Sequence, residues 1–211
     1  MGRALPGTGK HGNVALFVPH AGCSHRCSFC DQQVIAGTGE CLTPDKVEAA
    51  CLQAESRITL PGRQAELAFF GGSFTALPKK EMCALLDAAL PFVRRGVFRG
   101  IRLSTRPDCV DAAKLDYLAD LARRTYVCVE YGIESTSDAT LRTIDRGHDF
   151  AAARRAVEAT AARSVAVGAH FILGLPDESD TELLDRTRII NALPLATVKF
   201  HQLQFVEGTR M

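Results

Sequence analysis

The sequence has almost no net charge and no long apolar run, and these two absences exclude broad classes of protein. Its 25 lysine and arginine residues nearly balance 24 aspartate and glutamate residues, so the formal net charge is only +1. This balance argues against a strong electrostatic binder of nucleic acid, although a local basic patch is compatible with it. No stretch approaches the roughly 20 apolar residues of a membrane span, so we expect no association with a membrane.

A secretory signal and low-complexity segments are also missing. The opening stretch "MGRALPGTGKHGN" has no apolar core of the kind that a secretory signal requires. We therefore expect a cytoplasmic protein, in which thiols stay reduced and clustered cysteines indicate metal binding or catalysis more than disulfides. Since there is no long linker or short repeat, we expect a tail over residues 1–13 and one core domain over 14–211, truncated after its sixth strand.

Apolar β-rich runs alternate with helical patterns along the chain. The expected strands are 14–18, 66–70, 100–105, 126–134, 165–173 and 197–205. The expected helices cover about 44–58, 79–94, 111–123, 137–163 (interrupted at Gly147) and 179–192. Such βα-type units imply an α/β fold with parallel strands, either a doubly wound sheet or a complete or partial (β/α) barrel. In each of these folds the chemistry is expected at the C-terminal ends of the strands.

Three of the eight cysteines, Cys23, Cys27 and Cys30, lie within eight positions of one another after the first expected strand. Their spacing is C-x3-C-x2-C. A structural zinc site would need a fourth ligand, such as His20 or His25. A thioredoxin-type pair would use the last two cysteines and leave the first unexplained. A four-iron cluster on three local thiolates would have one iron without a protein ligand, which in an enzyme is a reaction site.

The triplet, with aromatic Phe29 before its last cysteine, resembles the signature of radical S-adenosylmethionine enzymes. The stretches "FVPHAGCSHRCSFCDQ", "FFGGSFTALP", "STRPD" and "VEYGIES…IDRGHDF" resemble the radical domain of the elongator catalytic subunit and its small bacterial relatives. "GAHFILGLPDES" and "VKFHQLQFVEGTRM" are most similar to those bacterial relatives. The resemblance covers roughly residues 14–211. With it, the expected fold is a partial (β/α)6 TIM-type barrel of parallel strands, with the cluster loop after the first strand.

This resemblance implies a 4Fe-4S cluster on the three cysteines and S-adenosylmethionine bound at the fourth iron. One electron from the cluster would cleave S-adenosylmethionine to a 5′-deoxyadenosyl radical, which abstracts hydrogen from a substrate. By motif match, Glu134 falls at a ribose-contacting position and Arg146 near the methionine carboxylate. Ser73 stands where many members have glutamate, so the contact to the methionine amine would either be weaker or use the serine hydroxyl. The cofactor-binding residues implied are Phe29, Gly71, Gly72, Ser73, Ser104, Glu134, Arg146 and His170.

The fourth expected strand carries two carboxylates that need partners. Alternation places Cys128, Glu130, Gly132 and Glu134 on one of its faces. A strand buried on both sides, as parallel sheets require, does not hold two uncompensated carboxylates cheaply. The cations that can compensate them are Arg106, Arg146, Lys199 or the cofactor itself.

Two further residues, Lys199 and His201, share a face of the sixth expected strand. They point either into the mouth of the barrel or, on a solvated edge strand, into water. For His170 alone, a satisfied core histidine is the simpler interpretation, and only the motif favours a cofactor role. We take Glu130, Lys199 and His201 as candidates for contact with the substrate, while the motifs assign no catalytic side chain.

The function that the resemblance implies is that of a radical enzyme served by a one-electron donor of the flavodoxin or ferredoxin type. The elongator-like relatives act on tRNA, which makes tRNA or another RNA a candidate substrate. The alternatives are a radical enzyme acting on a small molecule and a non-catalytic module that binds zinc or an iron–sulfur cluster. The other cysteines have no such spacing and are expected to be small inert residues, buried or on helices; they are Cys41, Cys51, Cys83, Cys109 and Cys128.

Overall fold

A computed structural model describes residues 10–18, 27–31, 41–58, 63–176 and 178–211 of the chain. Its strands form one sheet in the order β1-β2-β3-β4-β5-β6, and every neighbouring pair is parallel. The strands are β1 (Lys10–Val18), β2 (Arg63–Gly71), β3 (Gly100–Thr105), β4 (Tyr126–Glu134), β5 (Ala166–Leu173) and β6 (Thr197–Gln202). This arrangement is the predicted partial (β/α)6 TIM-type barrel.

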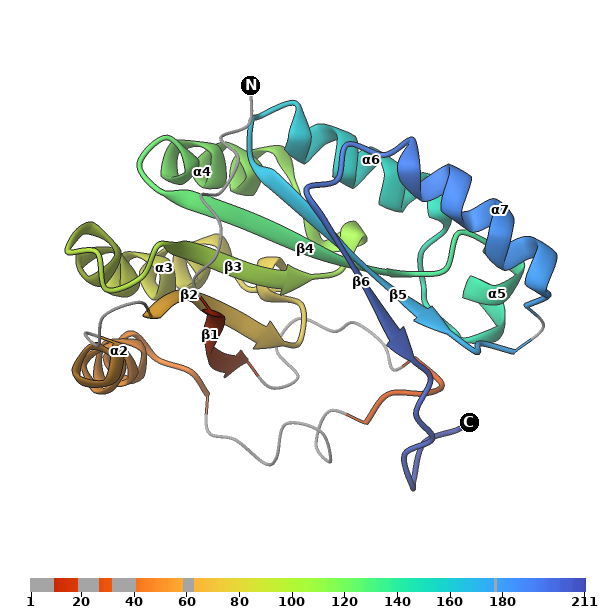
Figure 1. Ribbon diagram of the computed structural model, residues 1–211, viewed down its shortest axis with the longest axis horizontal. Helices are drawn as coiled ribbons and strands as arrows, with labels where there is room; N and C mark the ends of the chain where they lie inside the picture. Colours follow the sequence, from red (N-terminus) through yellow and green to blue (C-terminus); the bar gives the residue numbers. More distant parts are fainter. Residues whose placement is uncertain (1–9, 19–26, 32–40, 59–62, 177) are drawn as a thin grey trace.

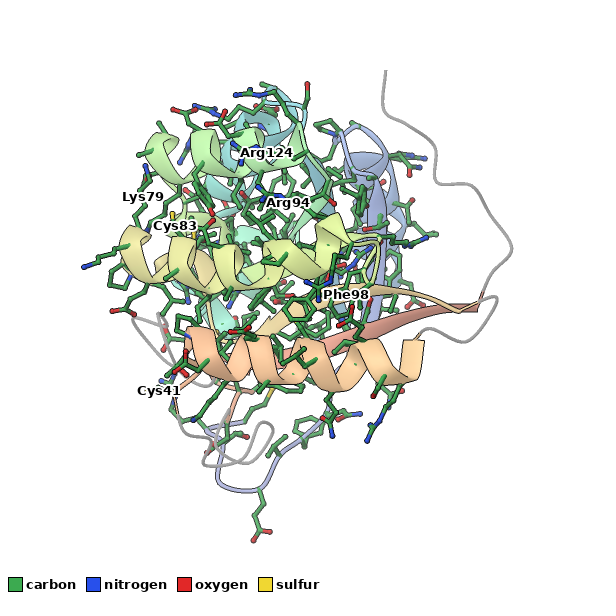
Figure 2. All side chains as sticks on the ribbon, turned by 90° about the vertical axis from the view of Figure 1, so that its left-hand side faces the viewer. Cys41, Lys79, Cys83, Arg94, Phe98 and Arg124 are labelled. Atoms are coloured by element: carbon green, nitrogen blue, oxygen red, sulfur yellow. The ribbon has the colours of Figure 1, made fainter. Side chains whose placement is uncertain are left out.

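Helices cover the outside of the curved sheet (Figure 1). They are α2 (Pro44–Ile58), α3 (Lys79–Arg94), α4 (Ala112–Ala122), α5 (Asp138–Thr143), α6 (Phe150–Ala161) and α7 (Asp180–Asn191), with short 3-10 turns η1 (Phe74–Ala76) and η2 (Pro107–Cys109). Figure 2 shows α2 and α3 side by side on one flank of the sheet. Among the described residues, no helix is both long and apolar enough to cross a membrane.

The element bounds differ from the predictions mainly at the ends of the sheet. β1 begins at Lys10, so its first residues lie in the stretch predicted as a tail, and β6 ends at Gln202 instead of 205. The predicted helix over 137–163 is divided into α5 and α6. The chain turns between them because Asp145 and Gly147 have φ values of 53° and 79°, which no helix allows.

Side-chain caps fix several of the helix starts. Ser179 and Glu182 form a reciprocal capping box at the start of α7, and the Asp149 carboxylate accepts from the Ala152 N–H at the start of α6. Thr43 caps the start of α2, since the Lys46 N–H donates to Thr43 Oγ1 at 3.4 Å. These short-range signals explain why the helix starts could be read from the sequence.

The hydrophobic core lies between the outer face of the sheet and the helices. Alternate residues of each central strand point outward and are fully buried there, among them Leu67, Phe69, Ile101, Leu103 and Val129. Helix α3 contributes Met82, Leu86 and Ala89 to the same core, because their spacing places them on one face of the helix. The apolar outer face therefore leaves the inner face of the sheet for polar side chains.

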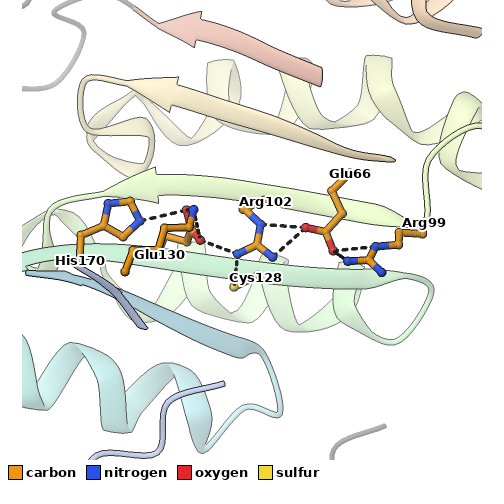
Figure 3. A network of polar contacts seen from close by, with 7 residues as sticks. Glu66, Arg99, Arg102, Cys128, Glu130 and His170 are labelled. Atoms are coloured by element: carbon orange, nitrogen blue, oxygen red, sulfur yellow. Dashed lines mark hydrogen bonds and ion pairs between the residues drawn. The ribbon is translucent and has the colours of Figure 1, made fainter. Parts of the chain in front are cut away.

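The inner face of the half-barrel is filled at its base by a chain of ion pairs (Figure 3). Arg99 and Arg102 both bind the carboxylate of Glu66, through Nε–H donors at 3.0 and 2.8 Å. Arg102 also pairs with Glu130, whose carboxylate is fully buried. In a closed barrel, layers of branched apolar side chains occupy this position. Here charged side chains occupy it, and each carboxylate lies against at least one guanidinium.

Glu130 has compensating partners, as the sequence required, and one of them, Lys199, was among the expected cations. Lys199 Nζ lies 2.8 Å from the Glu130 carboxylate, and His170 Nε2 lies 3.1 Å from Oε2. Arg102 and His170 are partners that the sequence did not suggest. Arg106, which was expected as a possible partner of the β4 carboxylates, instead pairs with Asp108 at 2.7 Å. It lies beyond the C-terminal end of β3.

These contacts predict how stability depends on Glu130 and on pH. Burial alone would raise the pKa of Glu130, but the hydrogen bonds of His170 and Lys199 and the charges of His170 and Arg102 lower it to about 2. We expect Glu130→Gln to cost roughly 3–5 kcal/mol of unfolding free energy near neutral pH, because it leaves buried cations unpaired. Since the folded pKa lies below the ordinary value of 4.5, the stabilisation is complete above that pH and is lost as the pH falls toward 2.

Urea unfolding of the wild type and the variant, repeated from pH 7 down to pH 3, measures both effects. The difference between the two proteins should be constant above about pH 5 and shrink below it. Glu55→Gln is the matched control, since Glu55 forms a partly exposed pair with Arg95 and should cost at most about 1 kcal/mol. A Glu130 variant as stable as this control would show that the ion pair does not support the barrel.

Candidate functional site

The described part of the chain contains a cavity of about 590 Å³ at the C-terminal ends of the last strands. Its lining comes from the cysteine turn, from the ends of β4, β5 and β6, and from the segment after β6: Phe29, Glu134, His170, Ile172, Phe200, His201, Gln202, Leu203, Gln204 and Val206. Four of the residues singled out from the sequence, Phe29, Glu134, His170 and His201, therefore meet in one cavity. The strand ends are where parallel α/β barrels place their sites.

The cysteine turn lies beside this cavity. The Cys30 N–H donates to the Cys27 carbonyl at 3.2 Å, and Cys27 is buried. Ser28 is held on both sides, because its N–H donates to the Ile144 carbonyl and its own carbonyl accepts from the Met211 N–H, each at 3.0 Å. The third predicted cluster ligand, Cys23, lies outside the described residues, as do His20 and His25. Within the described ranges, no three potential ligand side chains converge on one point.

Arg146 joins the cysteine turn to the cavity. Its Nη1 donates to Cys27 Sγ at 3.3 Å, and its Nη2 donates to the Gly132 carbonyl at 2.6 Å and lies 3.6 Å from Glu134 Oε1. The side chain is buried, and its Nε has no hydrogen-bond partner among the residues that the structure describes. One guanidinium thus contacts a cysteine sulfur, the end of β4 and a cavity carboxylate.

Glu134 reaches the cavity through a break in the strand pattern. The register of β4 against β5 shifts between Gly132 and Glu134, and Glu134 has a φ of 72°. The alternation expected from the sequence holds for Cys128 and Glu130, which both contact Arg102 on the inner face, but a bulge redirects Glu134. A Cβ on Gly132 would lie 2.5 Å from Glu134 Oε1, so only glycine allows this side chain to fold back over the strand.

Gly71, the last residue of β2, forms a tight turn with the two residues that follow it. Gly71 has a φ of 105°, and the Gly72 N–H donates to the Val18 carbonyl at 2.9 Å. Ser73 is buried. These residues lie at the β1 side of the sheet and are not among the lining residues of the cavity. Ser104, which neighbours Glu130 in the register of β3 and β4, does not line the cavity either. The predicted cofactor residues therefore fall into two groups along the sheet edge.

His170, Lys199 and His201 lie on the inner face of their strands. The rings of His170 and His201 are 5.0 Å apart between centroids, and Lys199 binds Glu130. Burial lowers the pKa of His201, and the charge of His170 lowers it further. Of the two orientations left open for β6, the one toward the barrel interior is present.

Arg186 of α7, which the sequence motifs did not single out, supports the cavity from behind. This buried guanidinium donates to the Ile172 carbonyl at 3.0 Å and to Ser135 Oγ at 3.2 Å, and it pairs with Glu178. Ile172 lines the cavity and Ser135 directly follows Glu134. The sequence contains a pattern that indicates this role. Arg186 shares the apolar face of α7 with Ile190, and a charge on such a face needs buried partners.

The remaining described cysteines differ in exposure. Cys51 and Cys128 are fully buried, and burial raises the pKa of their thiols to about 12 and about 11. Cys83 lies on α3, where burial also raises its pKa (Figure 2). Cys41, in contrast, is exposed and precedes α2, so the expectation of a buried or helical residue is wrong at this position.

Residues 17–188 of the chain match the family model of the radical SAM superfamily. The uncharacterised protein MJ0486 of Methanocaldococcus jannaschii is 32% identical over 144 residues, which make up 68% of this chain and 44% of that protein. The chain spans less than half the length of the curated relatives that it matches.

Solved structures share the fold at low sequence identity. The archaeal Elp3 of Methanocaldococcus infernus superposes with a TM-score of 0.69 and 18% identity, over 96% of this chain and 48% of that one. Coproporphyrinogen III oxidase (HemN) from Escherichia coli, described as a radical SAM enzyme, gives a TM-score of 0.63 and 16% identity over 94% of this chain and 45% of its own. At such identities the likeness establishes the fold.

The exposure of the cysteines outside the triplet predicts their reactivity. In the folded protein we expect iodoacetamide to modify Cys41 at least roughly tenfold faster than Cys51 or Cys128, because the thiolate is the nucleophile and burial suppresses it. Peptide mapping by mass spectrometry over a time course measures each rate. In denaturant the three rates should become similar. If Cys51 reacted as fast as Cys41 in the folded protein, the packing of α2 against the sheet would be incorrect.

Proposed function

The chain belongs to the radical SAM superfamily, and we propose that it binds a 4Fe-4S cluster and S-adenosylmethionine to begin radical chemistry on a substrate. One observation carries this proposal: Arg146 contacts both Cys27 Sγ and the cavity carboxylate Glu134. A single cation thereby links the position of a thiolate-bound cluster to a cavity of about 590 Å³, within the roughly 300–1,000 Å³ usual for cofactor sites.

The residues present fit an iron–sulfur cluster. Cys27 and Cys30 would supply two thiolates from one turn, and Cys23 would supply the third. The guanidinium of Arg146 already donates to a cysteine sulfur. Cationic donors beside the sulfurs favour thiolate ligands and tune a cluster's potential. When bound, the cluster would supply one electron to S-adenosylmethionine, and the cleavage would give methionine and a 5′-deoxyadenosyl radical.

The cavity residues fit an adenosine group. Phe29 and Ile172 offer apolar walls, and the Glu134 carboxylate offers acceptors for ribose hydroxyls. Arg146, next to Glu134, would bind the methionine carboxylate as a charge-assisted donor. Gly71, Gly72 and Ser73, with Ser104, remain the candidates for contact from the β1 side of the sheet edge, while His170 lies on the cavity side.

An apolar cluster beneath the cysteine turn would keep water from the reactive position. Leu141, Ile144, Ile172 and Leu175 pack together, and Phe29, Leu203 and Met211 cover them. The backbone hydrogen bond from Met211 to Ser28 and the ion pair between Arg210 and Asp145 hold the segment after β6 on this cluster. Exclusion of water is a contribution that the protein itself makes to radical chemistry.

The substrate and the reductant are inferred from the resemblance alone. Similarity to the elongator radical domain makes tRNA the first macromolecular substrate to test, with a small molecule as the alternative. A one-electron donor of the flavodoxin or ferredoxin type would reduce the cluster.

Anaerobic reconstitution tests the proposal. With iron, sulfide and a strong one-electron reductant, the protein should release 5′-deoxyadenosine from S-adenosylmethionine, detected by mass spectrometry. Cys27→Ala should lose both the cluster and the product, whereas the control Cys83→Ala should keep its iron content, since Cys83 lies on α3. A colourless protein that holds zinc would instead support a structural metal site. Full iron loading in the Cys27 variant would refute the ligand assignment.

Glu134 provides the second test, because its carboxylate lines the cavity and lies 3.6 Å from the buried guanidinium of Arg146. If it binds the ribose, Glu134→Ala should weaken S-adenosylmethionine binding about tenfold to a hundredfold, since a hydrogen bond to a charged group is worth about 1.5–3 kcal/mol. Calorimetric titration measures the affinity, and a thermal melt and iron assay show whether fold and cluster survive. Glu158→Ala is the control, since Glu158 is exposed on α6 and pairs there with the exposed Arg154. Unaltered affinity in a stable Glu134 variant would rule out the ribose role.

A further inference from the structure

Two phenylalanines that are partners in the register of β1 and β2 lie on the inner face of the half-barrel, away from the cavity already described. Leu16 and Val18 are buried in the core, so alternation turns Phe17 of β1 to the inner face, where 49% of its surface is exposed. Phe70 of β2 is its partner in the strand register and is partly exposed. Neither ring lines the cavity that contains Phe29 and Glu134.

Lys199 reaches these rings from the other end of the sheet. Its Nζ lies 5.4 Å from the centroid of the Phe70 ring and 2.8 Å from the Glu130 carboxylate. The curvature of the sheet therefore brings a cation of β6 over an aromatic ring of β2. An ammonium group has three N–H donors, and the carboxylate takes at most two of them, which leaves one for a ligand.

The balance of charges in the chain of ion pairs also leaves Lys199 available to a ligand. Arg99, Arg102 and Lys199 carry three positive charges against the two negative charges of Glu66 and Glu130. Among these cations the side chain of Lys199 is the most exposed, at 36%, compared with 19% for Arg99 and 5% for Arg102. The two buried carboxylates are thus neutralised by cations at the base of the half-barrel. The one excess positive charge faces the lumen beside the two phenylalanines.

We propose that Phe17, Phe70 and Lys199 form a substrate-binding surface for a planar aromatic or heteroaromatic ring that carries an anionic or hydrogen-bond-accepting group. The proposal rests on the proposed function in that this ring belongs to the molecule on which the radical acts. The ring stacks on the two phenylalanines, whose exposed faces lose water on contact. The acceptor takes the remaining donor of Lys199, in a charge-assisted bond at the edge of the stack.

Three matched probes test the chemistry of this surface without a cluster or turnover. They are 2-naphthoate, its saturated analogue decahydronaphthalene-2-carboxylate and the cationic 2-naphthylmethylamine, titrated by saturation-transfer NMR. We expect 2-naphthoate to bind at least roughly fivefold more tightly than either other probe, because only it has both the planar ring and the negative charge. Equal binding of all three would overturn the proposal, as it would show unselective apolar adsorption.

Variants locate the binding. Phe70→Leu and Lys199→Met should each weaken the binding of 2-naphthoate at least roughly fivefold. Phe17→Leu, at an exposed position, gives the same test without disturbing the buried Glu130. Phe205→Leu is the matched control, since Phe205 is 74% exposed and lies after β6. If S-adenosylmethionine displaces the probe, or if Ile172→Ala weakens it while Phe70→Leu does not, the ring binds in the cofactor cavity and the proposal fails.

The two proposals can fail separately. If binding of 2-naphthoate depends on Phe17, Phe70 and Lys199 in a protein that does not cleave S-adenosylmethionine, this surface stands and the radical function falls. If S-adenosylmethionine is cleaved but none of the three substitutions changes the binding of 2-naphthoate, the radical function stands and this surface falls.

Discussion

The buried carboxylate of Glu130 is the constraint on which the rest of this structure depends. It has no exposed surface, and parallel strands leave it no route to water. A buried ion without a partner costs several kcal/mol, so the sheet must bring cations and hydrogen-bonding groups to it from other strands. Arg102 of β3, His170 of β5 and Lys199 of β6 all contact it. These contacts tie three strands to the fourth through the inside of the barrel and determine which residues face the lumen.

The cofactor site depends on departures from regular structure at the strand ends. Glu134 faces the cavity because of a bulge and a positive φ, and Arg146 reaches Cys27 from a turn with left-handed residues at Asp145 and Gly147. Arg186 then holds the neighbouring Ser135 and the Ile172 carbonyl from α7. Irregular backbone of this kind persists only where the surrounding structure over-determines it. The regular barrel therefore supplies the frame, and a few buried arginines hold the irregular segments in the geometry that the site needs.

The fold and the site differ in how far they follow from the sequence. Alternation, helical spacing and caps act over a few residues, so the six strands, the helices and their order could be predicted, and the motif resemblance identified the partial barrel. Of the partners of Glu130, Lys199 was among the expected cations, whereas Arg102 and His170 were not, because the sequence does not show which strands are neighbours or how their residues align. The bulge at Glu134 was missed for the opposite reason: alternation was extended through Gly132, where the glycine marks a close approach of side chains.

The charged lining of the barrel also fixes the register of β4, which an apolar lining would fix less strongly. Because successive side chains of a strand point to opposite faces, a slip by one residue would turn Glu130 outward, toward the apolar core around Leu103 and Val167. There it would meet no cation, and Arg102 would lose one of its two carboxylates and keep only Glu66. The same slip would carry Tyr131, now bonded to Thr160 in the core, into the lumen. A wrong register therefore costs free energy in two ways, through the unpaired carboxylate outside the barrel and through the lost ion pair inside it. The correct register is the one that places Glu134 beside Arg146 and leaves Lys199 over the ring of Phe70.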